Sequence, residues 1–310
     1  ERTYPSSSFA CVEDMLARFL SAADVKPDRG VFAVSGPVTG AQAKPTNLPW
    51  CVGIQNVRSR FELSSVRLIN DIAAMAHAVP VLPASDFFVL NEGAAAKDGM
   101  SAVIAPGTGL GEAFFYRARG HSRVYASEGG HADYPAHNEI TWHLVRHLRE
   151  KCGHVSGEQI CSGRGIVNIY EFLRDEGYYG EPAWLKSALA CAGDRSAVII
   201  QAYNDAGKQN SLTTATIDLF ASLLGAEAGN LALKVMATGG IYLGGGIPRR
   251  ILPALQDGSF MDAFTAKGRF AGMMSRIPVR IILNEKAALI GSACVGLGSP
   301  PSTAGRAGRF

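Results

Sequence analysis

Two features of this sequence predict an α/β fold with a binding site at the ends of its strands. Short apolar runs typical of strands alternate along the chain with segments whose apolar residues recur at helical spacing. Three of these runs end in a glycine-rich turn or an Asn-Asp turn. In open α/β sheets the ligand lies outside the carboxyl ends of the strands, so these turns are the expected positions of functional residues.

The first part of the chain predicts helix, strand, strand and helix before a hairpin. Helical spacing begins at Phe9, after a run of cap-like serines, and continues to Leu20. The glycines after residue 105 then suggest a hairpin with residues 114–116. Strands are expected at residues 31–34, 66–69, 87–90 and 102–105, with a helix at 72–78.

The rest of the chain is expected to be mainly helical, with two further strands. Helices are expected around residues 140–148 and 217–231, the second one long and buried. A strand interrupted by two glycines is expected over residues 234–243, followed by a turn and a helix with Pro248 in its first turn. The pattern ends with a strand at 279–283, a helix at 287–295 and a disordered tail at 300–310.

Composition and charge argue against several classes of protein. The net charge is +3 and the Lys and Arg residues are scattered, so neither nucleic acid nor an anionic membrane is expected as a partner. We expect no membrane span and no signal peptide. The six cysteines form no C-x-x-C pair, which is typical of reduced thiols in a cytoplasmic protein. No metal site is expected either, because the spacing of His143, His147, Cys152, His154 and Cys161 matches no zinc pattern.

The first turn places Asn70-Asp71 at the end of a predicted strand. A kinase that phosphorylates an alcohol needs a base that accepts the hydroxyl proton, and a carboxylate such as Asp71 is chemically suited to this. The same two residues also suit a plain helix cap before Ile72. From the residues alone both interpretations stay open.

The second turn is Gly107-Thr108-Gly109-Leu110-Gly111. Glycines allow the backbone to approach phosphates closely, and a threonine hydroxyl adds a donor. The spacing is neither a Rossmann fingerprint nor a Walker loop, and a tight hairpin without a ligand explains it equally well.

The third turn, Gly244-Gly245-Gly246, precedes Pro248. It permits a flat ligand such as adenine to approach the start of a helix, or it serves only tight packing.

Carboxylates and a histidine occur in two further glycine-rich segments. Glu128 and His131 are three residues apart, and Glu158 precedes a Ser-Gly-Arg-Gly sequence. Such side chains accept and donate hydrogen bonds to sugar hydroxyls. Several carboxylates without a cationic cluster indicate a neutral polyol as the acceptor.

Together these segments resemble the bacterial-type glucokinase family, and the match runs in order along nearly the whole chain. The matching segments are Ser35-Gly36-Pro37-Val38-Thr39-Gly40, Thr46-Asn47 with Trp50, Leu68-Ile69-Asn70-Asp71, Gly107-Thr108-Gly109-Leu110-Gly111, Glu128-Gly129-Gly130-His131, His154-Val155-Ser156 with Glu158, Ser162-Gly163 with Gly165, Gly244-Gly245-Gly246-Ile247, Lys267-Gly268-Arg269-Phe270 and Leu289-Ile290-Gly291-Ser292.

The resemblance implies the two-domain actin-like and hexokinase-like fold, related to ribonuclease H, with the active site in the cleft between the domains. It implies a small α/β domain at residues 1–81, completed by a C-terminal helix at 286–299. The large α/β domain is expected at 82–285, followed by the tail at 300–310.

The resemblance also assigns roles to individual residues. It makes Asp71 the general base for the 6-hydroxyl of glucose. The other sugar hydroxyls are expected to bind Asn70, Glu128, His131 and Glu158. Phosphates are expected at Gly107, Thr108, Gly109 and Gly111, and the adenosine at Gly245 and Gly246.

The implied reaction is ATP-dependent phosphorylation of D-glucose, which gives glucose 6-phosphate and ADP. Magnesium is implied, held mainly through the nucleotide phosphates, since the β- and γ-oxygens need charge neutralisation as the bond breaks. A cytoplasmic homodimer is the family expectation.

The sequence departs from the family pattern at its start. The family opens with a strand, an Asp-x-Gly-Gly-Thr-Asn turn and a second strand, and no such turn occurs here. We therefore expect the first phosphate-binding hairpin to be missing and the 310 residues as written to have little kinase activity.

Two alternatives remain open. One is a related hexose or N-acetylhexosamine kinase of the ROK type, although the cysteine-rich zinc motif of that family does not follow His131. The other is a catalytically impaired sugar-binding homologue, against which the intact Asp71 speaks.

Overall fold

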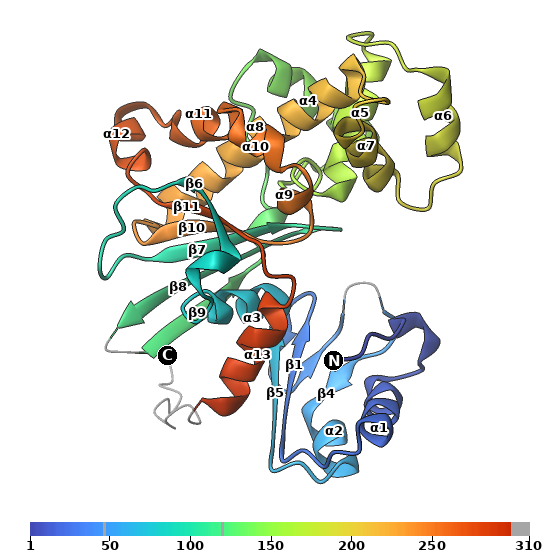
Figure 1. Ribbon diagram of the computed structural model, residues 1–310, viewed down its shortest axis with the longest axis vertical. Coiled ribbons are helices and arrows are strands. Elements are labelled where there is room, and N and C mark those ends of the chain that lie inside the picture. The colour runs from blue at the N-terminus through green and yellow to red at the C-terminus, as the bar shows by residue number, and fades with distance from the viewer. Residues whose placement is uncertain (46–47, 119–120, 299–310) are drawn as a thin grey trace. The chain divides into compact units, whose positions relative to one another are not determined.

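The computed structural model describes residues 1–45, 48–118 and 121–298 (Figure 1). The chain divides into two compact units. Unit 1 contains Glu1–Pro80 and Ala287–Phe310, and unit 2 contains Val81–Lys286. Two expectations lie outside the described residues, namely the Thr46-Asn47 part of the resemblance and the disordered tail at 300–310.

Unit 1 combines a parallel pair of strands with a small antiparallel sheet. β1 (Arg29–Val34) runs parallel to β5 (Ser65–Asn70), and Val34 lies opposite Asn70. The carboxyl ends of both strands therefore lie at one edge. The other elements are η1 (Ser6–Ser8), α1 (Val12–Ala23), β2 (Val38–Thr39), β3 (Gln42–Ala43), β4 (Val52–Gly53), α2 (Ile54–Arg60), α3 (Asp71–Ala78) and α13 (Ala287–Leu297).

The helix expected from Phe9 begins three residues later, at Val12. Phe9 lies in extended conformation, and its carbonyl accepts a 3.1 Å hydrogen bond from Trp50 Nε1. At the other end of the chain, α13 packs on α3. Gly291 permits this close approach, because a Cβ there would overlap Ala74 O.

Unit 2 is built on one sheet of six strands in the order β6-β11-β10-β7-β8-β9. β7, β10 and β11 are parallel, so their carboxyl ends meet at one edge. β7, β8 and β9 form an antiparallel meander, which confirms the hairpin expected around the glycines. The strands are β6 (Phe87–Asn91), β7 (Ser101–Pro106), β8 (Leu110–Ala118), β9 (His121–Ser127), β10 (Gly240–Leu243) and β11 (Val279–Ile282).

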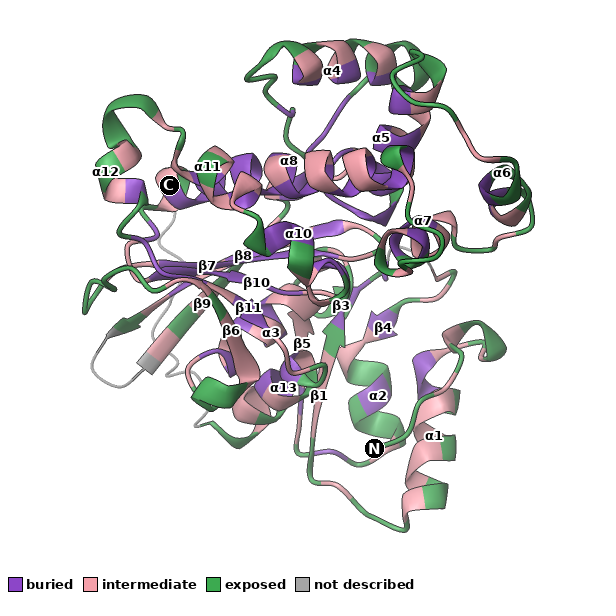
Figure 2. Ribbon diagram, turned by 45° about the horizontal axis from the view of Figure 1, so that its top comes forward, coloured by how far each residue is buried: buried purple, intermediate pink, exposed green. Residues whose placement is uncertain are grey.

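The core of unit 2 lies between this sheet and the long helix α8 (Ser211–Val235), which is buried over much of its length (Figure 2). Asn210 caps this helix by accepting a 3.1 Å bond from Thr213 N. The remaining elements are η2 (Ala84–Asp86), η3 (Gly129–His131), α4 (Glu139–Cys152), α5 (Gly163–Asp175), α6 (Ala183–Ala190), α7 (Arg195–Asn204), α9 (Ile247–Arg250), α10 (Leu252–Gln256), α11 (Ser259–Thr265), η4 (Gly268–Phe270) and α12 (Ala271–Met274).

The strand expected over residues 234–243 is wrong in its first half. Lys234 and Val235 are the last residues of α8, and Met236 ends the helix in left-handed conformation at φ 50°. Only Gly240–Leu243 is a strand. The apolar spacing of the helix continues through Leu231 and Val235, so the run of apolar residues spans a helix end and a turn rather than one strand. The helix expected around Pro248 is confirmed as α9.

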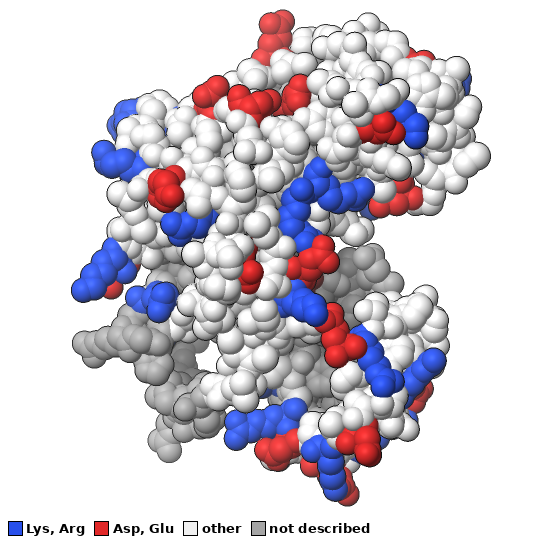
Figure 3. Space-filling view, in the orientation of Figure 1, with Lys and Arg blue, Asp and Glu red and all other residues white. Residues whose placement is uncertain are grey.

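Charged side chains of both signs are interspersed on the face drawn in Figure 3. Among the described residues, oppositely charged side chains form close ion pairs, such as Arg249 Nη1 with Glu285 Oε1 at 2.6 Å. Across the described ranges, no helix combines the length and the apolar character that crossing a membrane requires.

Candidate active site

The 107–111 loop is the tip of the β7–β8 hairpin and is tied to the start of α5. Gly107 N donates to Gly109 O at 2.8 Å, which closes the turn. Gly107 O accepts a 2.8 Å bond from Gly163 N, the first residue of α5. Thr108 at the tip is exposed. The loop is therefore held in place while its tip stays accessible to a ligand.

Glu158 connects this loop to the segment that carries Glu128 and His131. Glu158 Oε2 accepts a 3.1 Å hydrogen bond from Leu110 N, and a Cβ on Gly109 would overlap the same carboxylate. Glu158 N donates to Gly130 O at 2.8 Å. One predicted sugar ligand thus contacts the predicted phosphate loop directly.

The 128–131 segment forms the short helix η3 and packs on β8. Glu128 Oε2 lies 3.9 Å from His131 Nε2, and the two side chains are 51% and 57% exposed. Gly130 is required here, because a Cβ would overlap Leu110 O. The carboxylate and the imidazole therefore stand next to each other, half accessible, at the start of β8.

The 244–246 turn leaves β10 beside the end of β7. Gly244 N donates to Ile104 O at 2.9 Å. Gly245 has φ +78°, and a Cβ there would overlap Pro106 O, whereas a Cβ on Gly246 would meet nothing within 4 Å. Since Pro106 directly precedes Gly107, the two glycine turns lie side by side at one edge of the sheet.

Asn70 and Asp71 belong to unit 1, where β5 meets α3. Asn70 Oδ1 accepts hydrogen bonds from Ile72 N at 2.9 Å and Ala73 N at 3.0 Å, so Asn70 is the cap of the helix. Its Nδ2 donates to Gly36 O at 3.3 Å, which joins the two strand ends. Asp71 is the first helical residue, and its Oδ1 accepts from Ile72 N at 2.9 Å. The capping interpretation thus applies to Asn70, and the catalytic role of Asp71 stays a prediction.

The family model for glucokinase matches residues 1–297. The chain belongs to the glucokinase family. A curated glucokinase of Trichormus variabilis is 36% identical over 305 residues, which cover 94% of this chain and 89% of the relative. A glucokinase of Nitrobacter hamburgensis is 37% identical over 290 residues, covering 93% and 87% of the two chains.

Solved structures agree with this assignment. The crystal structure of a glucokinase from an Antarctic psychrotroph matches with a TM-score of 0.80 and 31% identity, covering 95% of this chain and 88% of that chain. A glucokinase of Balamuthia mandrillaris in complex with glucose matches with a TM-score of 0.73 and 21% identity, covering 93% and 84% of the two chains. The predicted two-domain actin-like fold is therefore confirmed, and the chain is a sugar kinase of the glucokinase family.

Unit 2 brings together most of the residues predicted for the site of this glucokinase-family chain. The 107–111 loop, the 128–131 segment, Glu158 and the 244–246 turn are joined by the contacts described above. Their binding roles stay predictions.

Sequence reasoning missed Glu112, the second residue after the loop's Leu110. Its side chain is only 4% exposed, and burial raises its pKa to about 7, with a further rise from Glu227 and an opposing effect of Lys234. A Cβ on Gly129 would overlap Glu112 Oε2. The signal available in the sequence was a single acid among small and apolar residues, directly after the glycine loop and just before the strand expected at 114–116.

Histidines of the 143–161 segment, whose spacing matches no zinc pattern, form ion pairs with carboxylates instead. His147 Nδ1 lies 2.9 Å from Glu176 Oε1, and His154 Nε2 lies 2.9 Å from Asp133 Oδ1. Within the described ranges no three His, Cys, Asp or Glu side chains gather in a way that holds a metal ion.

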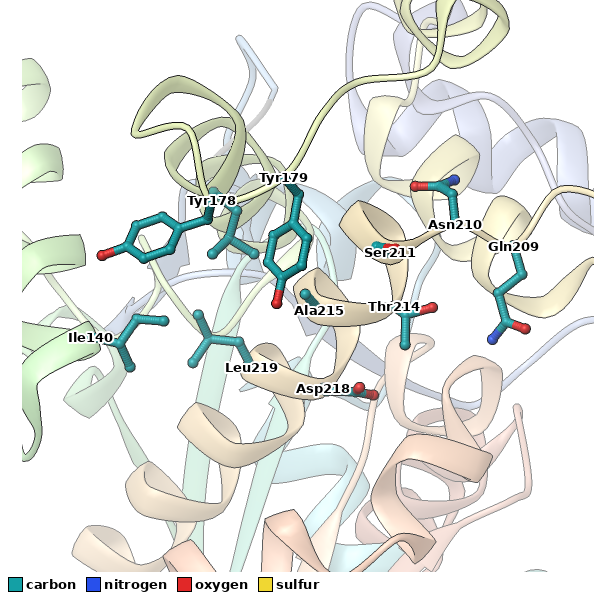
Figure 4. A pocket seen from close by; sticks show the side chains of 11 residues that line it. Ile140, Tyr178, Tyr179, Gln209, Asn210, Ser211, Thr214, Ala215, Asp218 and Leu219 are labelled. Atoms are coloured by element: carbon teal, nitrogen blue, oxygen red, sulfur yellow. The ribbon is translucent and has the colours of Figure 1, made fainter.

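A hollow of ≈ 790 Å³ on unit 2 lies between the start of α4, the loop after α5 and the first half of α8. Tyr178 and Tyr179 border it on one side and Asp218 and Leu219 on another (Figure 4). None of the residues that line it belongs to the segments predicted for the site. We therefore do not count it as part of the candidate active site.

Proposed function

We propose that this chain transfers the γ-phosphoryl group of ATP to the 6-hydroxyl of D-glucose. The observation that carries the proposal is the bond between Leu110 N and Glu158 Oε2, because it joins a glycine loop suited to phosphates to a carboxylate suited to sugar hydroxyls. The loop joins two strands of the sheet, and the carboxylate comes from the connection between α4 and α5. This arrangement supports a reaction between a phosphorylated donor and a neutral polyol.

The proposed sugar contacts use carboxylates and one imidazole. Glu128, His131 and Glu158 accept or donate hydrogen bonds to the ring hydroxyls, and Asn70 contributes an amide. Asp71 accepts the proton of the 6-hydroxyl as its oxygen attacks phosphorus. Capping occupies Asn70 Oδ1 and Gly36 O accepts one hydrogen of Nδ2, so the second Nδ2 hydrogen is the donor available to a sugar.

The proposed nucleotide contacts come from the two glycine turns. We place Gly107, Thr108, Gly109 and Gly111 against the phosphates, and Gly245 and Gly246 against the adenosine. Gly107 N–H closes the turn on Gly109 O, so Gly107 contributes close backbone approach rather than a free donor. The open space at Gly246 supports such an approach, because a ligand meets no side chain there.

Magnesium is proposed to arrive with the nucleotide and to be held mainly by its phosphates. The glycine turns of unit 2 supply backbone groups rather than a cage of carboxylates, and this donor set fits a cation that the nucleotide itself ligates. When bound, the cation neutralises charge on the β- and γ-oxygens.

A cytoplasmic location and a homodimer complete the proposal. All six cysteines are free, which supports a reducing compartment. The homodimer is an expectation from the family resemblance, and light scattering coupled to size-exclusion chromatography measures it directly.

The test of the reaction is Asp71→Asn in the full-length protein, assayed for ADP release with glucose and Mg-ATP. Asparagine keeps an oxygen that can accept from Ile72 N, so the start of α3 is preserved while the base is lost. We expect turnover to fall by about 10² or more with glucose binding retained in calorimetry. Asp28→Asn is the matched control, since its carboxylate in the same unit is 72% exposed and pairs only loosely with Arg29 at 3.5 Å. Turnover of Asp71→Asn near that of the control refutes the assignment.

A further inference from the structure

Glu112 is a buried acid that lies directly beneath the 128–131 segment. It follows the 107–111 loop on β8 and is paired in the sheet with Ile104 on one side and Ser127 on the other. Its Oε2 occupies the space that a Cβ of Gly129 would need. Its Oε1 is buried without a hydrogen-bond partner among the described residues. The carboxyl group therefore supports the backbone between Glu128 and His131 and is almost fully buried.

The surroundings of Glu112 disfavour a second negative charge. Glu227 on α8 is also only 4% exposed and accepts a 3.1 Å bond from Asn230 Nδ2. Asn230 Oδ1 accepts in turn from Lys267 Nζ at 2.9 Å. Lys267 is therefore engaged on the Glu227 side, through Asn230.

The other groups around Glu112 do little to stabilise an ionised carboxylate there. Ile104 and Ser127, on the flanking strands, carry no charge. Lys234 on α8 lowers the pKa of Glu112, but this effect is smaller than the rise caused by burial and by Glu227. The thiol of Cys161 and the phenol of Tyr134 are buried, and burial raises the pKa of both, so they stay neutral. Glu128, directly before η3, and His131, the last residue of η3, are half exposed to solvent.

We propose that Glu112 is a positioning residue whose neutral carboxyl group supports Gly129 and thereby holds Glu128 and His131 in the arrangement that binds the sugar. This inference rests on the proposed function, because it takes the 128–131 segment as a sugar-binding segment. Ionisation places a second charge near Glu227 in a space closed to water. The short helix η3 then has to move away from β8 to hydrate the carboxylate, and glucose binds more weakly.

The expected effect is a loss of glucose affinity as the pH rises. Burial and Glu227 raise the pKa of Glu112 to about 7. If only the neutral form binds glucose, the competent fraction falls by about 30-fold between pH 5.5 and 8.5. Turnover at saturating glucose changes much less, because bound glucose selects the neutral form.

The first experiment is calorimetric titration of glucose into the full-length protein, without nucleotide, from pH 5.5 to 8.5. We expect the affinity of the original protein to fall and that of Glu112→Gln to stay within about twofold over the whole range. In buffers of different ionisation enthalpy at pH 7.5, glucose binding is expected to take up most of one proton in the original protein and none in Glu112→Gln. His131 is present in both proteins, so a pH profile or proton uptake that persists in Glu112→Gln overturns the proposal.

Two further variants keep the test decisive. Glu227→Gln removes the repulsion, so the midpoint of the affinity loss is expected at lower pH. This variant provides the test if Glu112→Gln does not fold, since an unchanged midpoint then overturns the proposal. Glu128→Gln tests the underlying function separately, since it removes a proposed sugar ligand and leaves Glu112 in place. Unchanged glucose affinity in Glu128→Gln refutes the sugar-binding role of the segment, whereas a persistent pH profile in Glu112→Gln refutes only the role of Glu112.

Discussion

Replacing Gly109 by alanine tests whether the phosphate loop and the sugar carboxylate act as one unit. The new Cβ overlaps the carboxylate of Glu158, which then has to swing away and lose its 3.1 Å bond from Leu110 N. A hydrogen bond to a charged group is worth about 1.5–3 kcal/mol. If the displaced carboxylate also loses its bond to the sugar, glucose affinity falls by about 10- to 100-fold.

The matched control is Gly107→Ala at the other end of the same turn. A Cβ on Gly107 meets nothing within 4 Å, and neither glycine has the positive φ that disfavours alanine. The two variants therefore add the same methyl group, but only one displaces Glu158. We expect calorimetry without nucleotide to show weakened glucose binding for Gly109→Ala and unchanged binding for Gly107→Ala. Equal glucose affinities of the two variants refute the coupling.

Two more predictions concern stability. Gly245→Ala forces alanine into φ +78° and against Pro106 O, so we expect urea unfolding to show a free energy of unfolding lower by about 2–4 kcal/mol. Gly246→Ala has open space around it and is expected to lower the free energy of unfolding by less than about 1 kcal/mol. Burial raises the pKa of Glu112 to about 7 in the folded protein, against 4.5 in the unfolded chain. The free energy of unfolding is therefore expected to fall as the pH rises from 4.5 to 7, by about 3 kcal/mol in full. Urea unfolding at pH 5 and pH 8 is expected to show this loss in the original protein and not in Glu112→Gln, and an equal loss in both contradicts it.

The sequence was sufficient to predict the turns, because each depends on residues that are close together in the chain. Glycines at 107–111 and 244–246 and the Asn70-Asp71 pair mark strand ends by their own conformational preferences. The periodicity of α8 likewise predicted its buried face, although not its end at Val235.

What the sequence did not reveal depends on packing between distant segments. Whether Glu112 is solvated or buried is decided by segments distant in the chain, such as η3, which packs on β8 only in the folded unit. The bond from Leu110 N to Glu158 joins β8 to the connection between α4 and α5, and no local pattern predicts it. Similarly, Asn70 rather than Asp71 is the cap, which depends on where α3 begins.

The meander of β7, β8 and β9 has a consequence for the order of synthesis and folding. Its strands pair with their immediate neighbours in the chain, so the 107–111 loop and the 128–131 segment close through contacts of short sequence separation. The 244–246 turn joins only when β10 pairs with β7, with Gly240 opposite Ser101. During synthesis, the 107–111 loop and the 128–131 segment are therefore translated long before the 244–246 turn that is proposed to contact the adenosine. A nascent chain stalled after Glu158 leaves unpaired the β7 edge that later pairs with β10, and such an exposed edge is prone to pair with other chains.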